Sequence, residues 1–223
     1  MIVAIDGAVK KPGTPDCLSV GCALFPEANP DSLYAAKVES RDTTSQRGEI
    51  NGLICALQRA IDDGLTNDDV IIITDSQYLH DTVVYEWITK WKNAGWIAAN
   101  GEPPKNLDQW KIVDELLITL NSRFVTVNMQ WTKGHLFRYP AGKIAACMKE
   151  DYTGATLLSS INTLMSVATA KSTVVKAFNK ERSEHGFAFL PDTLAAEYVL
   201  YNTTVDAIAV YIANLAQAAK DQA

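Results

Sequence analysis

Short apolar runs separated by turn residues dominate the first forty positions. Residues 2–6, 19–25 and 33–39 are rich in apolar side chains, and glycine, proline, asparagine and aspartate gather between them. Apolar runs bounded by turn formers are typical of β-strands. Because the links are short, we expect three consecutive strands in an antiparallel meander, with residues 7–18 as a loop.

The period of the pattern then changes from strand to helix. Apolar residues recur at three- and four-residue intervals from Ile50 to Ile61, with Ser45 as the expected N-cap and Gly64 as the expected stop. Residues 70–74 follow as a β-branched apolar run. A strand, a helix and a strand in this order predict a parallel crossover, and the simplest partner for residues 70–74 is the first strand.

Helices are expected to dominate the rest of the chain. The pattern predicts helices at residues 76–96, 107–121, 155–180, 192–201 and 203–220, a strand at 124–131 and a loop at 100–104. The whole pattern indicates an α/β fold, and the character of the sequence shifts from residue 136 to about residue 201.

Composition narrows the class of protein. The chain has 223 residues, which suits one large domain or one domain with a sizeable insertion. A net charge of −6 argues against indiscriminate nucleic-acid binding but permits local basic patches. We find no apolar run of ~18 residues, no charged leader and no C-x-x-C pair. We therefore expect a cytoplasmic protein with reduced thiols and no membrane partner.

Four acidic residues stand in distinctive local settings. Asp6 and Asp75 each end an apolar run, and Glu49 and Asp206 lie near the starts of predicted helices. Carboxylates beside a dry core are costly unless something pairs with them. Two strands that both end in Asp suggest a shared purpose, and the commonest such purpose is to hold divalent cations. Parallel pairing would place Asp6 and Asp75 side by side at the carboxyl ends of adjacent strands. The alternatives are strand ends in solvent, an exposed helix residue for Glu49 and a helix-dipole contact for Asp206.

Several segments, in order, carry a resemblance to type 1 ribonuclease H. They are Asp6-Gly7, Thr43-Thr44-Ser45-Gln46-Arg47-Gly48-Glu49, Thr74-Asp75-Ser76-Gln77-Tyr78, Trp87-Ile88-x-x-Trp91-Lys92, Trp131-x-Lys133-Gly134-His135 and Asn202-x-x-x-Asp206. The likeness covers residues 1–135 and 202–215.

The resemblance implies a ribonuclease H-like fold, with a mixed five-stranded sheet flanked by helices. It assigns residues 1–135 and 202–223 to a catalytic domain, and leaves residues 136–201 as a large, mainly helical insertion of unknown role before the last catalytic Asp. Because the insertion lies next to His135 and Asp206 in the sequence, we expect it to influence substrate access. Its own protein partner is unknown.

The activity that the resemblance implies is endonucleolytic, metal-dependent hydrolysis of the RNA strand of RNA–DNA hybrids. Two Mg²⁺ ions, for which Mn²⁺ can substitute, would lie ~3.5–4 Å apart. Asp6, Glu49, Asp75 and Asp206 are the expected ligands. His135 is the expected proton-transfer group or an aid to product release. A lone histidine is more often structural, and His135 is singled out by its Lys-Gly-His context.

Contacts to the hybrid are also implied by the resemblance. The candidates, in chain order, are Thr44, Ser45, Gln46, Gln77, Trp87, Trp91 and Lys92. Thr44 would hold a DNA phosphate, and Ser45, Gln46 and Gln77 would lie in the minor groove, where 2′-hydroxyls distinguish RNA from DNA. Four of these positions have a simpler explanation: Ser45 as an N-cap, Trp87 and Trp91 as packing residues, and Lys92 as part of a solvated face.

Two rival functions remain open from the sequence. Enzymes of the same fold cleave DNA, and the tryptophan and lysine series from residue 87 argues against that choice. The other rival is a non-catalytic hybrid-binding module. It gains nothing from four acids facing phosphates.

Overall fold

A five-stranded mixed sheet forms the centre of the protein, as the sequence predicts. The structure is a computed structural model that describes residues 1–40 and 43–222. The strands lie in the order β3-β2-β1-β4-β5. Their bounds are β1 Ile2–Lys10, β2 Leu18–Leu24, β3 Tyr34–Ser40, β4 Asp69–Thr74 and β5 Thr126–Trp131. The first three strands pair antiparallel, and β1, β4 and β5 pair parallel.

The register places Asp6 within β1 and not at its end, which corrects the expectation of a loop from residue 7. Pairing between β1 and β4 stops at Ala4 opposite Ile73, whereas pairing between β1 and β2 continues to Lys10 opposite Leu18. The hairpin partner β2 therefore keeps β1 extended past the point where β4 leaves it. Asp6 lies just beyond that divergence, beside the end of β4 where Asp75 follows.

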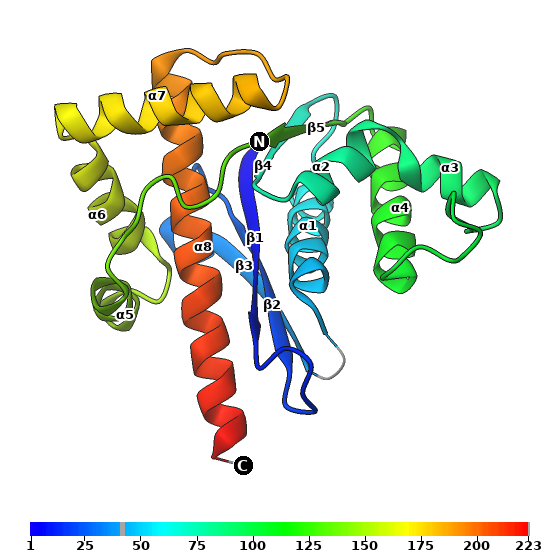
Figure 1. The fold of residues 1–223 in the computed structure, drawn as a ribbon, viewed down its shortest axis with the longest axis horizontal. Coiled ribbons are helices and arrows are strands. Elements are labelled where there is room, and N and C mark those ends of the chain that lie inside the picture. Colours follow the sequence, from blue (N-terminus) through cyan, green and yellow to red (C-terminus); the bar gives the residue numbers. More distant parts are fainter. Residues whose placement is uncertain (41–42, 223) are drawn as a thin grey trace.

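Helices cover both faces of the sheet (Figure 1). On one face lie α1 Ser45–Asp62, α2 Gln77–Val84, α3 Trp87–Asn93 and α4 Leu107–Ser122. On the other face lies α8 Asp192–Asp221, with α5 Ala141–Glu150, α6 Ala155–Met165 and α7 Ala168–Glu184 beside it. A short 3₁₀ helix, η1 Pro30–Ser32, precedes β3.

Successive side chains of β1 point to opposite faces of the sheet and so contribute to two hydrophobic cores. Val3 and Ile5 pack with α1 and α4 in one core, while Ala4 packs with α8 in the other. Side chains of α6 and α7, including Ile161 and Phe178, belong to the second core. The helices between β5 and α8 therefore share a core with the sheet. The boundary proposed at residues 201/202 falls inside α8.

Several helices differ from the predicted ones. The predicted helix 76–96 is two helices, because Glu86 adopts a left-handed conformation with φ of 55° between α2 and α3. The predicted helix 155–180 breaks between α6 and α7. The N-cap of α1 is Thr44 and not Ser45, since the Thr44 side chain accepts a hydrogen bond from Arg47 N. Residues 192–201 and 203–220 are one helix, α8.

The continuity of α8 has a packing cause. Asn, Thr and Thr at positions 202–204 are weak helix formers. All three residues are buried, and Thr204 Oγ1 donates to the Leu200 carbonyl oxygen at 2.8 Å. Tertiary burial thus overrides local propensity. By length and composition α8 is also long and apolar enough to cross a membrane, but 56% of its most apolar window is buried within this fold.

Candidate active site

The first acid, Asp6, is nearly enclosed. The residue is 7% exposed, and the backbone N–H of Gly7 donates to Asp6 Oδ1 at 2.6 Å. No lysine or arginine pairs with this carboxylate in residues 1–40 and 43–222. Because burying an unpaired charge is costly, a carboxylate in this setting is stabilised by binding a cation or a proton.

Close packing at glycine brings Glu49 to Asp6. A Cβ on Gly7 would lie 2.4 Å from Glu49 N, so only glycine lets α1 approach β1 this closely at Glu49. Ser76 Oγ donates to Glu49 Oε2 at 2.6 Å and also accepts from Leu79 N as the N-cap of α2. Ser76, which the sequence analysis did not single out, therefore orients the second acid.

A second glycine contact brings Asp75 to the loop after β5. A Cβ on Gly134 would lie 2.1 Å from Asp75 Oδ2, so the loop that carries His135 lies directly against this carboxylate. The indole Nε1 of Trp131 donates to the Asp75 backbone carbonyl at 3.2 Å. The end of β4 and the end of β5 are thus tied together around the third acid.

The fourth acid comes from the middle of α8. Because α8 starts at Asp192, Asp206 is not near a helix start, and the helix-dipole explanation for it is wrong. His135 Nδ1 lies 3.6 Å from Asp206 Oδ2, and His135 has a φ of 59°. The histidine side chain is 68% exposed, so it stands at the solvent side of the acids.

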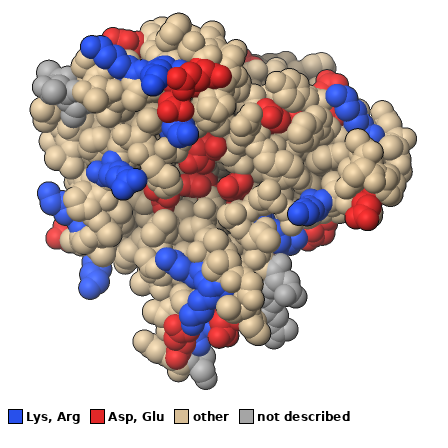
Figure 2. Space-filling model, viewed as in Figure 1, with Lys and Arg blue, Asp and Glu red and all other residues tan. Residues whose placement is uncertain are grey.

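Burial and mutual repulsion raise the pKa values of Asp6, Glu49 and Asp75. Burial, followed by repulsion from Asp75 and Asp206, raises the pKa of Asp6 well above its usual range. Burial and then Asp206 raise the pKa of Asp75, while His135 opposes that shift. Burial raises the pKa of Glu49, and the Ser76 hydroxyl opposes the shift. Figure 2 shows acidic side chains gathered near the middle of one face.

The donor set is one that hard divalent cations prefer. Carboxylate oxygens are the usual protein ligands of Mg²⁺. In this conformation no three His, Cys, Asp or Glu side chains of the described residues converge tightly enough to enclose one ion. The carboxylates repel one another across the site, and a divalent charge would relieve that repulsion.

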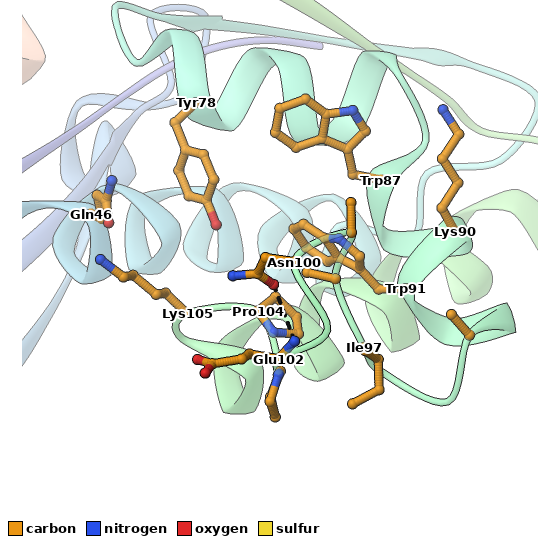
Figure 3. A pocket seen from close by; sticks show the side chains of 14 residues that line it. Gln46, Tyr78, Trp87, Lys90, Trp91, Ile97, Asn100, Glu102, Pro104 and Lys105 are labelled. Atoms are coloured by element: carbon orange, nitrogen blue, oxygen red, sulfur yellow. Dashed lines mark hydrogen bonds between the residues drawn. The ribbon is translucent and has the colours of Figure 1, made fainter.

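The candidate nucleic-acid contacts fall into two places. Thr44 and Ser45 are exposed at the start of α1, and Gln77 is exposed at the start of α2. Gln46, Trp87 and Trp91 instead line a groove of about 890 Å³ that lies beside α3 (Figure 3).

The groove has an aromatic floor and lysines at its edges. The Trp87 and Trp91 rings lie 6.3 Å apart, and Trp91 packs against the buried Trp110 at 5.9 Å. Lys90 and Lys105 line the groove. Lys92 does not line it, since Lys92 Nζ pairs with Asp114 Oδ2 at 2.6 Å.

Comparisons with known proteins agree with the sequence resemblance. Residues 1–146 match the RNase H family model. A ribonuclease H of Maricaulis maris is 40% identical over 94 residues, or 42% of this chain and 57% of that protein. A ribonuclease HI of Pseudomonas syringae pv. tomato is 34% identical over 131 residues, or 59% of this chain and 77% of that protein.

Among solved structures, LC9-RNase H1, a type 1 RNase H with the type 2 active-site motif, is similar with a TM-score of 0.44 at 24% sequence identity. That match covers 60% of this chain and 64% of the other. The PFV RNase H domain is similar with a TM-score of 0.45 at 21% identity, covering 58% and 77%. On the strength of the family model, which spans well over half of its residues, the chain belongs to the ribonuclease H family.

Proposed function

We propose that the protein hydrolyses the RNA strand of RNA–DNA hybrids at internal positions, using two divalent cations held by Asp6, Glu49, Asp75 and Asp206. The observation that supports this most is the burial of Asp6 against other acids without a basic partner among the described residues. Membership of the ribonuclease H family supports the choice of reaction.

The residues fit Mg²⁺ by their chemistry. Four carboxylates supply oxygen ligands. Burial and then repulsion between the acids raise the pKa values of Asp6, Glu49 and Asp75, and a bound cation would favour their ionised forms. When bound, such ions lower the pKa of water and stabilise charge on the phosphate.

The chain's own groups orient the acids and move a proton. The Gly7 N–H and the Ser76 hydroxyl fix one oxygen each of Asp6 and Glu49. In this proposal His135, which is exposed and whose Nδ1 lies 3.6 Å from Asp206 Oδ2, gives a proton to the departing 3′-oxygen or helps the cleaved strand leave.

Substrate binding would use the surface that runs from the start of α1 to the groove beside α3. Thr44, Ser45, Gln46 and Gln77 supply polar groups, and the groove supplies ring faces with two lysines. Phosphate contacts by lysine give affinity without sequence preference. In this proposal Lys90 and Lys105 contact the backbone, and Lys92 does so only when it leaves Asp114.

One assay tests the proposal. Labelled RNA–DNA hybrid, double-stranded RNA and double-stranded DNA are incubated with the protein, with and without Mg²⁺ or Mn²⁺. We expect internal cleavage of the RNA in the hybrid only, with metal only, and its loss in Asp6→Asn and Asp75→Asn. Cleavage of DNA would favour the DNA nuclease, and binding of hybrid without turnover would favour the binding module.

A matched control separates chemistry from folding. Asp81→Asn alters an acid beside His80 on α2, outside the carboxylate cluster. Asp81→Asn is expected to retain cleavage. Retained cleavage in Asp6→Asn or Asp75→Asn would remove the two-metal proposal.

A further inference from the structure

Arg182, near the end of α7, is a buried cation held by carbonyls and rings. Its residue exposure is 4%. Arg182 Nη1 donates to the Trp131 carbonyl oxygen at 2.5 Å, and Arg182 Nε donates to the Ala188 carbonyl oxygen at 3.0 Å. Its guanidinium lies 5.2 Å from the Phe187 ring centroid and 5.6 Å from that of Phe178.

This arginine has no acid partner among the residues that the structure describes. Burying a guanidinium is costly, and ring faces and neutral carbonyls offset only part of that cost. Its planar fork does, however, hold two carbonyls in fixed directions, which a lysine cannot do. The contribution of Arg182 is therefore geometric more than energetic.

The part that Arg182 holds is Trp131, the last residue of β5. The Trp131 ring stacks on Phe187, with centroids 5.5 Å apart and planes at 19°, and packs against His185 at 4.5 Å. Three residues at and just after the end of α7 thus contact Trp131. Arg182 binds its backbone carbonyl, and His185 and Phe187 pack on its ring.

Trp131 in turn contacts the end of β4 that carries a catalytic acid. Its indole Nε1 donates to the Asp75 carbonyl oxygen at 3.2 Å, and the next amide, Thr132 N, donates to Thr74 O at 2.9 Å. Two residues later, Gly134 lies against the Asp75 carboxylate. A chain of direct contacts therefore runs from α7 through Trp131 to Asp75.

We propose that Arg182 is a positioning residue of the active site, which acts through Trp131 to fix Asp75 and the loop that carries His135. The proposal rests on the proposed function for its effect on turnover. In this proposal α7, one of the helices between β5 and α8, holds the edge strand β5 in place beside the acids.

The first test is kinetic. Arg182→Met removes both hydrogen bonds and keeps apolar bulk, and displacement of a positioned group costs roughly tenfold to a hundredfold in rate. We expect kcat on the hybrid to fall by that factor with KM changed less than about twofold, and Arg182→Lys to recover part of kcat. Arg59→Met is the control, because Arg59 also lies over a ring, that of Phe25 at 5.3 Å, and donates to a carbonyl oxygen, that of Ser32 at 3.4 Å. Unlike Arg182, Arg59 also pairs with an acid, Asp63, at 2.7 Å.

A double-mutant cycle asks whether the effect passes through Trp131. Trp131→Phe deletes the N–H that bonds Asp75. If Arg182 acts through that indole, the losses of kcat in the two single variants will not add in the double variant, as is usual for residues in one network. Additive losses, or an unchanged kcat in Arg182→Met below its melting temperature, would overturn the proposal.

A spectroscopic readout does not depend on turnover. In a ¹⁵N-labelled sample, the Trp131 indole N–H resonance is identified by its disappearance in Trp131→Phe. It is expected to shift in Arg182→Met and to stay in place in Arg59→Met. An unmoved resonance would refute the positioning role whether or not the protein cleaves hybrid, whereas absent cleavage by the wild type with a shifted resonance would refute only the proposed function.

Discussion

Asp6→Asn is expected to make the metal-free protein more stable at neutral pH. Burial and then repulsion from Asp75 and Asp206 raise the pKa of Asp6, so its ionised form is disfavoured in the folded state. The contribution of this group to the free energy of unfolding is fully present below the unfolded pKa of an aspartate. It is lost as pH rises through the raised folded pKa. At pH 7 the charge therefore opposes folding, and asparagine removes it while still accepting from Gly7 N.

The magnitude follows from the burial of the group. Removing one uncompensated buried charge is worth on the order of 1–3 kcal/mol. In a domain of this size each kcal/mol shifts the melting temperature by about 2–4 °C. We therefore expect a rise on the order of 5 °C for Asp6→Asn in EDTA at pH 7.

Thermal unfolding followed by circular dichroism between pH 4 and pH 8 measures this directly. The gain should shrink toward pH 4, where the wild-type carboxyl binds a proton, and saturating Mg²⁺ should stabilise the wild type more than the variant. Asp108→Asn is the control of opposite sign, because a hydrogen bond from Arg47 lowers the pKa of Asp108. A lower melting temperature for Asp6→Asn at pH 7 without metal would show that this reading of the carboxylate cluster is wrong.

Three further changes test the site. Ser76→Ala removes the hydroxyl that lowers the pKa of Glu49, so the acidic limb of the pH–rate profile should move to higher pH, and an unmoved limb would deny Ser76 this role. Gly134→Ala puts a methyl group where a carboxylate oxygen lies 2.1 Å away, so kcat should fall at least about tenfold, whereas Gly142→Ala, with open space around it, should be neutral. Lys105→Ala should raise KM for the hybrid and reduce the slope of log affinity against log salt by about 1, and an unchanged slope would place Lys105 outside the substrate path.

Much of the fold follows from local pattern. The β-branched run at residues 70–74 has one plausible geometry, a buried parallel strand, and pairing with β1 then brings Asp6 next to Asp75. The helical period from Ile50 onward likewise fixes α1 and places Glu49 near the start of that helix. These features are local in sequence or depend on one crossover.

What the sequence did not predict depends on contacts between distant segments. Asn202 lies inside α8 because the helix is buried there, and only the packed fold provides that burial. Glu86 adopts a left-handed backbone that no local signal demands. Arg182 has the sequence context of an ordinary helix charge, and only the packed fold shows that β5 and Phe187 enclose it.

The long helix α8 has a consequence for any attempt to shorten this protein. Asp206 sits halfway along a rod whose first turns are sandwiched between α6, α7 and the sheet. Excising residues 136–201 would remove the helices that pack against one side of α8. It would also remove the first part of α8 itself, including the buried residues Tyr198 and Val199. A minimal fragment would thus expose apolar surface and leave Asp206 on a helix without its packing partners. A chimera should therefore transfer the whole segment from β5 to the end of α8 as one unit.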